Sequence, residues 1–287
     1  MGDWLAAVLL GIIEGITEFL PISSTGHLLI AERWLGVRSD LFNIAIQAGA
    51  ILAVVAIYRR RLLELGRSFL SPRGGIASGH PPAANAVDAP LAQPPRDYAW
   101  KLLAAFGVTA ILGVLVKLRG FELPTEIAPI AWALVIGGLW MLVAEYFAAR
   151  RAATVGERAA ITWRVAVPVG IAQVIAGVFP GTSRSGASIF VALLAGTTQR
   201  AAATEFAFLV GIPTMFAATA YEGAAVLREH GTGGEDWSLL AIAFVTSAIT
   251  AFVAVKWLLR YIQTHRFTLF AIYRIVLGCM LLLWLAR

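Results

Sequence analysis

A polar segment of twenty residues occurs twice in this chain, each time inside an apolar stretch. Residues 11–30 align with residues 170–189, and six identical pairs coincide: Gly11/Gly170, Ile12/Ile171, Ile16/Ile175, Pro21/Pro180, Ser24/Ser183 and Ile30/Ile189. The copies differ in charge, because the first holds the ionisable residues Glu14, Glu18 and His27 whereas the second holds Arg184. A repeat that divides acidic and basic groups between its copies predicts one site assembled from both.

The composition indicates the solvent around the fold. Hydrophobic residues make up 59% of the chain, charged residues make up 14%, and the mean hydropathy is +0.77. Several apolar runs reach the roughly 20 residues that a helix needs to cross a bilayer. We therefore expect an integral membrane protein in contact with membrane lipids. Its one cysteine, Cys279, excludes a disulfide framework or a thiolate metal cluster.

Apolar runs bounded by charge or proline predict six transmembrane helices, near residues 42–58, 99–117, 127–147, 203–227, 238–257 and 267–286. The repeated segments, residues 4–36 and 163–196, differ from these spans because each is broken at Pro21 or Pro180. Proline interrupts a helix, and an irregular turn within a bilayer must be enclosed by protein. We interpret both segments as re-entrant helical hairpins.

This arrangement predicts an all-α fold with an inverted-topology repeat. Residues 1–287 form a single membrane domain, in which residues 1–147 and 163–287 each hold one hairpin and three spans. An odd number of crossings inverts the second half relative to the first. Residues 71–97 are rich in proline, glycine and alanine, which predicts a flexible cytoplasmic loop.

Basic residues predict the orientation of the chain. Three alternate connections are rich in arginine and lysine: Arg59, Arg60, Arg61, Arg67, Arg73 and Arg96; Arg150, Arg151, Arg158 and Arg164; and Lys256, Arg260 and Arg266. The positive-inside rule makes these connections cytoplasmic and places both termini outside. The net charge of +6 is explained by these loops, with anionic lipid as the counterpart and no nucleic-acid partner.

Two glutamates precede the break in the first hairpin. Glu14 and Glu18 are four residues apart, so a helix places them on one face. A charged side chain in the middle of the membrane costs about 2.5 to 3.5 kcal/mol on insertion scales. These two carboxylates therefore need a partner, a proton or a metal ion.

After each break the sequence predicts a new half-helix with a hydroxyl side chain as its N-cap. The candidates for binding phosphate at these helix starts are Ser23, Thr25 and Gly26 in the first hairpin and Thr182, Ser183, Ser185 and Gly186 in the second. The candidates for catalysis in the same segments are Ser24, His27 and Arg184. Helix N-termini bind phosphate through free amide groups, and two of them converging within the membrane would form an anion pocket. Arg184 offers a fork of donors for phosphate oxygens, although it is also able to neutralise Glu14 or Glu18.

The candidate residues together suit phosphoryl transfer. His27 follows Ser24 by three residues, so one helical turn would bring the imidazole and the hydroxyl within reach of each other. A nucleophile, a base, two carboxylates and an arginine can position a phosphate and stabilise its developing charge.

These two motifs resemble the undecaprenyl-diphosphate phosphatase family, the BacA-type bacitracin-resistance proteins of bacterial inner membranes. The resemblance is carried by the block from Glu14 to His27 and by Pro180-Gly-Thr-Ser-Arg-Ser-Gly186, and it covers nearly the whole chain. It implies dephosphorylation of a C55 polyprenyl diphosphate lipid at a site open to the periplasm, with a divalent cation. Carried onto this chain, the catalytic set is Glu18, Ser24, His27 and Arg184, and Glu14 with Glu18 would hold Mg²⁺ or Ca²⁺.

Several alternatives stay open at this point. Ser24, His27 or a metal-activated water could attack the phosphorus, and a homodimer is neither required nor excluded. Paired hairpins in an inverted repeat are also typical of transporters, so a flippase for polyprenyl phosphate lipids is the rival function, alone or alongside hydrolysis. The role of Arg274, inside the last predicted span, also stays open: it could pair with Glu205 or Glu145 or reach the cytoplasmic interface.

Overall fold

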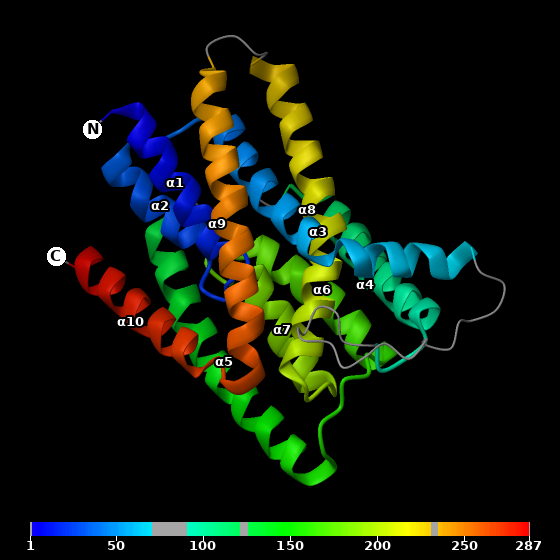
Figure 1. Cartoon of the computed structure of the whole chain (residues 1–287). Helices are drawn as coiled ribbons and strands as arrows, with labels where there is room; N and C mark the ends of the chain where they lie inside the picture. Colours follow the sequence, from blue (N-terminus) through cyan, green and yellow to red (C-terminus); the bar gives the residue numbers. More distant parts are fainter. Residues whose placement is uncertain (1, 71–90, 121–125, 231–234, 287) are drawn as a thin grey trace.

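A computed structural model describes residues 2–70, 91–120, 126–230 and 235–286. Within these ranges the chain forms ten α-helices and no strands, which confirms the all-α prediction (Figure 1). The helices are α1 (Asp3–Thr17), α2 (Ser24–Leu35), α3 (Asp40–Leu70), α4 (Pro95–Leu118), α5 (Ile127–Val155), α6 (Trp163–Val178), α7 (Arg184–Ala195), α8 (Arg200–His230), α9 (Trp237–Thr264) and α10 (Thr268–Leu285).

Six of these helices are long and apolar enough to cross a membrane, and they coincide with the six predicted spans. They are α3, α4, α5, α8, α9 and α10, with 18 to 31 residues each. The predicted flexible loop at residues 71–97 extends too far, because Pro95 and Asp97 lie in the first turn of α4. Proline is tolerated there, since the first amides of a helix have no internal partner. Residues 71–90 of that prediction lie outside the described residues.

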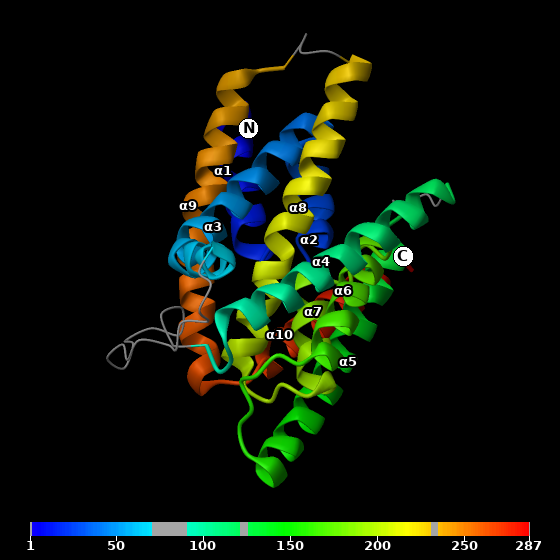
Figure 2. The same cartoon turned by 90° about the vertical axis from the view of Figure 1, so that its right-hand side faces the viewer.

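Each repeated segment forms a hairpin of two short helices, α1 with α2 and α6 with α7, followed by three long helices. The helices α5 and α10 hold corresponding places in the two halves and lie antiparallel. Gly138 faces Ala271 and Ile275, whereas Gly278 faces Ala131 and Leu134. Corresponding helices of an inverted repeat must run in opposite directions, so this pair has the expected sense. Figure 2 shows α6 alongside α4, as α1 lies alongside α9 in Figure 1.

Small residues allow α1 to approach α9 closely. A Cβ atom added at Gly15 would lie 2.0 Å from the Thr250 hydroxyl and 2.5 Å from the Ser247 carbonyl oxygen. Close backbone approach through small residues is the usual way in which membrane helices pack, because lipid provides no hydrophobic force between them.

We expect Gly15→Ala to destabilise the protein by about 1–3 kcal/mol, the usual cost of overpacking a well-packed contact. Thermal unfolding in detergent measures the effect. Gly113→Ala in α4 is the matched control, because a Cβ atom there meets nothing within 4 Å. Equal unfolding temperatures for both variants would contradict the close α1–α9 packing.

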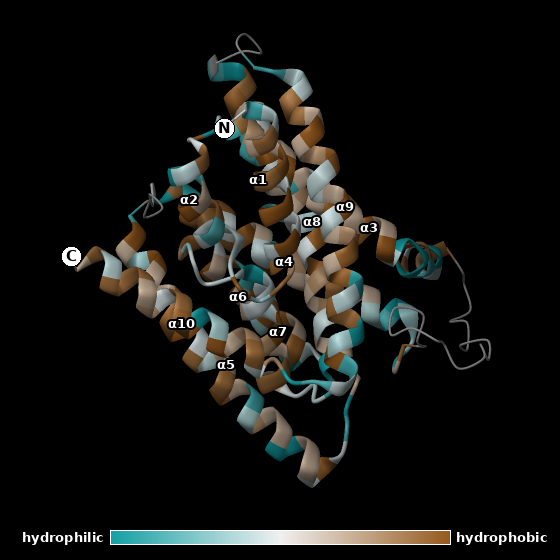
Figure 3. Cartoon of the chain, turned by 60° about the vertical axis from the view of Figure 1, so that its left-hand side comes forward, coloured by the Kyte–Doolittle hydropathy of each residue, from teal (hydrophilic) through white to brown (hydrophobic). Residues whose placement is uncertain are grey.

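The outer surface of the bundle is apolar. Figure 3 shows hydrophobic residues predominating along α9 and α10. Tryptophans near the span ends are exposed by 48% to 85%: Trp4, Trp34, Trp100, Trp163, Trp237, Trp257 and Trp284. Exposed tryptophan at helix ends is typical of the interface between membrane and water.

Candidate functional site

The two half-helices begin with the same backbone conformation. Ser23 caps α2 and Ser183 caps α7, and the hydroxyl of each accepts a hydrogen bond from the amide three residues later, at Gly26 or Gly186. Within the described chain these serines are the two non-glycine residues with positive φ, at 74° and 70°. Such conformations cost about 1–3 kcal/mol each and gather at functional sites. The predicted hydroxyl N-caps are therefore confirmed in both hairpins.

The N-caps also correct the alignment of the repeat. Pro21 corresponds to Pro180, but Ser23 rather than Ser24 corresponds to Ser183, so the second turn has one additional residue. Gly181 lies in this turn with a φ of 92°, a conformation that suits glycine. The first residues of the two half-helices, Ser24 in α2 and Arg184 in α7, are thus structural counterparts.

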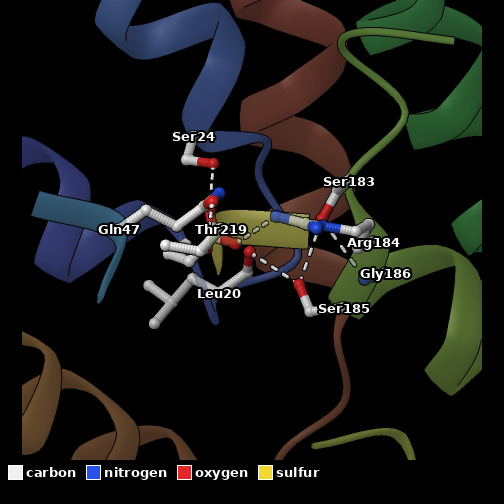
Figure 4. A network of polar contacts seen from close by, with 9 residues as sticks. Leu20, Ser24, Gln47, Ser183, Arg184, Ser185, Gly186 and Thr219 are labelled. Atoms are coloured by element: carbon white, nitrogen blue, oxygen red, sulfur yellow. Dashed lines mark hydrogen bonds and ion pairs between the residues drawn. The ribbon is translucent and has the colours of Figure 1, made fainter. Parts of the chain in front are cut away.

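Both counterparts bind the same carboxylate. Arg184 donates a hydrogen bond to Oε1 of Glu18 at 2.9 Å, and the Ser24 hydroxyl donates to Oε2 of Glu18 (Figure 4). The Glu18 side chain is 4% exposed and that of Arg184 is 26% exposed. Three of the predicted catalytic residues, one of them from the other half of the chain, therefore meet at one point.

Further contacts hold the second half-helix against the first turn. The Ser185 hydroxyl donates to the Leu20 carbonyl at 3.1 Å and lies 3.1 Å from the Ser183 hydroxyl. A Cβ atom at Gly186 would lie 3.4 Å from Pro21. The two hairpin tips are therefore in direct contact, as a shared site requires.

Other candidates lie at the edge of this group. Glu14 is 2% exposed, and its Oε2 has no hydrogen-bond partner among the described residues. Thr25 is exposed, and the carbonyl of Thr182 rather than its hydroxyl is bound, by Arg274. In addition, Thr219 of α8 donates to Gln47 of α3 at 3.1 Å, a pair that the sequence did not indicate (Figure 4).

Arg274, whose role the sequence left open, binds both hairpin tips and neither of the two candidate glutamates. Its guanidinium donates to the carbonyls of Pro21, Ala133, Gly181 and Thr182 at 2.9–3.3 Å, and the residue is 1% exposed. The two candidate glutamates have other partners: Glu145 binds Arg200 and the Phe267 amide, and Glu205 binds Arg61. Its position inside an apolar span did not tell which groups it binds, and the partners found are carbonyls and not carboxylates.

His27 does not pair with Ser24 in this structure. Its Nδ1 lies 2.7 Å from the Ser23 carbonyl oxygen, and its Nε2 lies 2.6 Å from the Tyr273 hydroxyl. Both ring nitrogens therefore have other partners, and the Ser24 hydroxyl is bound by Glu18. Sequence spacing placed His27 correctly on the first turns of α2 but gave no sign of Tyr273, which lies on α10.

Six helices of spanning length and a buried ion pair shared by two hairpin tips define a multi-pass membrane protein with a polar site inside its bundle where the two tips meet. Comparison with known proteins gives the family. The chain matches the model of the family "Bacitracin resistance protein BacA" over residues 7–280, and it belongs to that family.

Relatives of the chain extend over nearly its full length. An undecaprenyl-diphosphatase of Rhizobium etli (strain CIAT 652) is 62% identical over 280 residues, which cover 98% of this chain and 96% of the relative. An undecaprenyl-diphosphatase of Xanthomonas euvesicatoria pv. vesicatoria (strain 85-10) is 55% identical over 285 residues, with 99% and 98% covered.

Proposed function

We propose that this protein hydrolyses undecaprenyl diphosphate to undecaprenyl phosphate and inorganic phosphate. The observation that carries the proposal is the arrangement around Glu18, to which one hairpin brings a hydroxyl and the other a guanidinium. The names and full-length similarity of the relatives support the same substrate.

The geometry suggests a role for each group. Ser24 attacks the terminal phosphorus, and Glu18, already the acceptor of its hydrogen bond, takes the hydroxyl proton. The bond from this phosphorus to the bridging oxygen breaks, and undecaprenyl phosphate leaves with that oxygen. Water then cleaves the phosphoserine to release inorganic phosphate and restore the hydroxyl.

Arg184 and the half-helix ends would stabilise the charge on the transferred group. Among the described residues Glu18 uses one of the five guanidinium N–H donors of Arg184, so the others are available to phosphate oxygens. The first-turn amides of α2 and α7 lie at positive helix ends, which favour anions. Fixed donors directed at developing charge are the usual main source of catalysis in such sites.

A divalent cation fits the carboxylates present. Glu14 has a buried oxygen without a hydrogen-bond partner, one helical turn from Glu18. Mg²⁺ is commonly held by one or two carboxylates together with substrate phosphates, so Glu14 and Glu18 would be its protein ligands. A bound Mg²⁺ or Ca²⁺ would neutralise charge on the diphosphate.

We place the protein in the bacterial inner membrane with this site open to the periplasmic side. The arginine-rich α5–α6 and α9–α10 connections lie at one end of the molecule (Figure 1). The N-terminus, the C-terminal end of α8 and the N-terminal end of α9 lie at the opposite end. The positive-inside rule makes the arginine-rich end cytoplasmic. A flippase would use Arg184 and the half-helix ends but would have no need of the Ser24–Glu18 pair, so we favour hydrolysis.

We expect Ser24→Ala to lower phosphate release from undecaprenyl diphosphate by at least about 10³-fold, because removing a nucleophile leaves only the binding and charge stabilisation of the site. Ser68→Ala is the matched control, since Ser68 is a half-buried helical serine remote in sequence from both hairpins and its hydroxyl donates to the Leu65 carbonyl of its own helix. Full activity in Ser24→Ala would overturn Ser24 as the attacking group and leave His27 or water in that role.

A further inference from the structure

The contacts of His27 determine which ring nitrogen carries its proton. A carbonyl oxygen only accepts hydrogen bonds, so Nδ1, which faces the Ser23 carbonyl, must be the N–H donor. In the neutral ring Nε2 is then the acceptor, and the Tyr273 hydroxyl donates to it. The Tyr273 hydroxyl therefore binds the ring nitrogen that carries no proton.

The Tyr273 side chain is also placed to orient the imidazole. The two rings are stacked, with centroids 5.6 Å apart and an angle of 11° between their planes. Tyr273 directly precedes Arg274, whose guanidinium holds both hairpin tips, so its backbone position is coupled to the site. The hydroxyl thus reaches His27 from an element that is fixed against both halves.

Helices α2 and α10 have a second side-chain contact near their C-terminal ends. The Arg33 guanidinium of α2 lies over the Trp284 ring of α10, 5.1 Å from its centroid. Tyr273 is itself 43% exposed and lies at the margin of the polar group rather than in its centre. A group in this place is accessible to an arriving substrate.

We propose that Tyr273 is a positioning residue for His27: the Ser23 carbonyl sets the Nδ1–H tautomer, and the Tyr273 hydroxyl fixes the direction of Nε2 from α10. The proposal rests on the proposed hydrolysis for its effect on rate, but the pairing itself does not depend on turnover. A hydrogen bond to one ring nitrogen of a histidine commonly fixes the orientation of the ring.

The test removes the hydroxyl and keeps the ring, in Tyr273→Phe. Loss of one hydrogen bond predicts a fall in kcat of about three- to tenfold with little change in KM. In a His27→Ala background the same substitution should cause no further loss, because Tyr273 acts through His27. Tyr146→Phe on α5 is the matched control, since Tyr146 is 59% exposed and has an edge-to-face contact with Phe147.

A second readout needs no turnover. Diethylpyrocarbonate modifies neutral imidazole, and the modification of His27 can be followed by mass spectrometry of its peptide. Removing the hydroxyl from Nε2 should make His27 react several-fold faster in Tyr273→Phe than in wild type or Tyr146→Phe. An unchanged modification rate, or an equal loss of kcat with and without His27, would overturn the proposal. A protein that releases no phosphate but shows the faster modification would instead overturn the proposed function and leave the pairing intact.

Discussion

Arg184→Ala is expected to lower kcat/KM for undecaprenyl diphosphate by about 10²–10³-fold or more, the range found when one preorganised donor is removed from a site of developing charge. The substitution removes the ion pair by which Glu18 is held to the second half of the chain, and it also removes the remaining guanidinium donors. Phosphate release by the purified protein in detergent measures the effect.

Two further variants make the result specific to the guanidinium. Arg184→Lys keeps the charge but lacks the planar fork, so its activity should fall between those of wild type and Arg184→Ala. Arg260→Ala, at an exposed position on α9, should behave as wild type. Wild-type turnover in Arg184→Ala would show that the second hairpin takes no part in the reaction.

Arg274→Ala is expected to lower both stability and activity. It would leave four carbonyls, on both hairpin tips and on α5, without their donor. Each buried group left unpaired costs about 1–3 kcal/mol, partly offset because a buried charge is removed, so we expect a net loss of about 3 kcal/mol or more. Thermal unfolding in detergent, recorded beside the phosphate assay, separates the two effects.

Comparing the Arg184 and Arg274 variants distinguishes a residue that binds the phosphate from a residue that joins the two hairpin tips. Both variants should lose activity, but Arg184→Ala should lose less stability than Arg274→Ala, because Glu18 keeps its hydrogen bond from Ser24 whereas four carbonyls lose their donor in Arg274→Ala. Where Arg274→Ala does not fold, Arg274→Lys provides the measurement, because one ammonium cannot reach all four carbonyls and should give an intermediate loss. An Arg274 variant as stable and active as wild type would refute the role of this residue in joining the tips.

Local patterns in the sequence were sufficient to predict the helices and the start of each half-helix. Apolar runs of spanning length, interrupted by proline and followed by serine, are signals that lie within short stretches of sequence. The meeting of Glu18, Ser24 and Arg184 also followed from the repeat, because an inverted pair of hairpins directs two tips to the same place. Membership of the BacA family agrees with the motifs that carried the resemblance.

The partners of the buried polar groups could not be predicted in this way. The sequence left the role of Arg274 open, and the two glutamates considered as its partners, Glu145 and Glu205, bind Arg200 and Arg61 instead. The Tyr273–His27 pair joins residues 246 positions apart and leaves no periodic signal. The additional residue in the second turn, which makes Ser23 rather than Ser24 the counterpart of Ser183, could not be seen in the sequence either. Both turns contain adjacent hydroxyl residues, so either serine of the first turn can be aligned with Ser183.

The proposed hydrolysis is tested most directly by phosphate release from undecaprenyl diphosphate by wild-type protein purified in detergent, first with a chelator and then with Mg²⁺ or Ca²⁺ restored. We expect release of one phosphate for each undecaprenyl phosphate formed, abolished by the chelator and recovered with the cation. No release from folded protein under any of these conditions would contradict hydrolysis, and a lipid-flipping assay would then test the rival function.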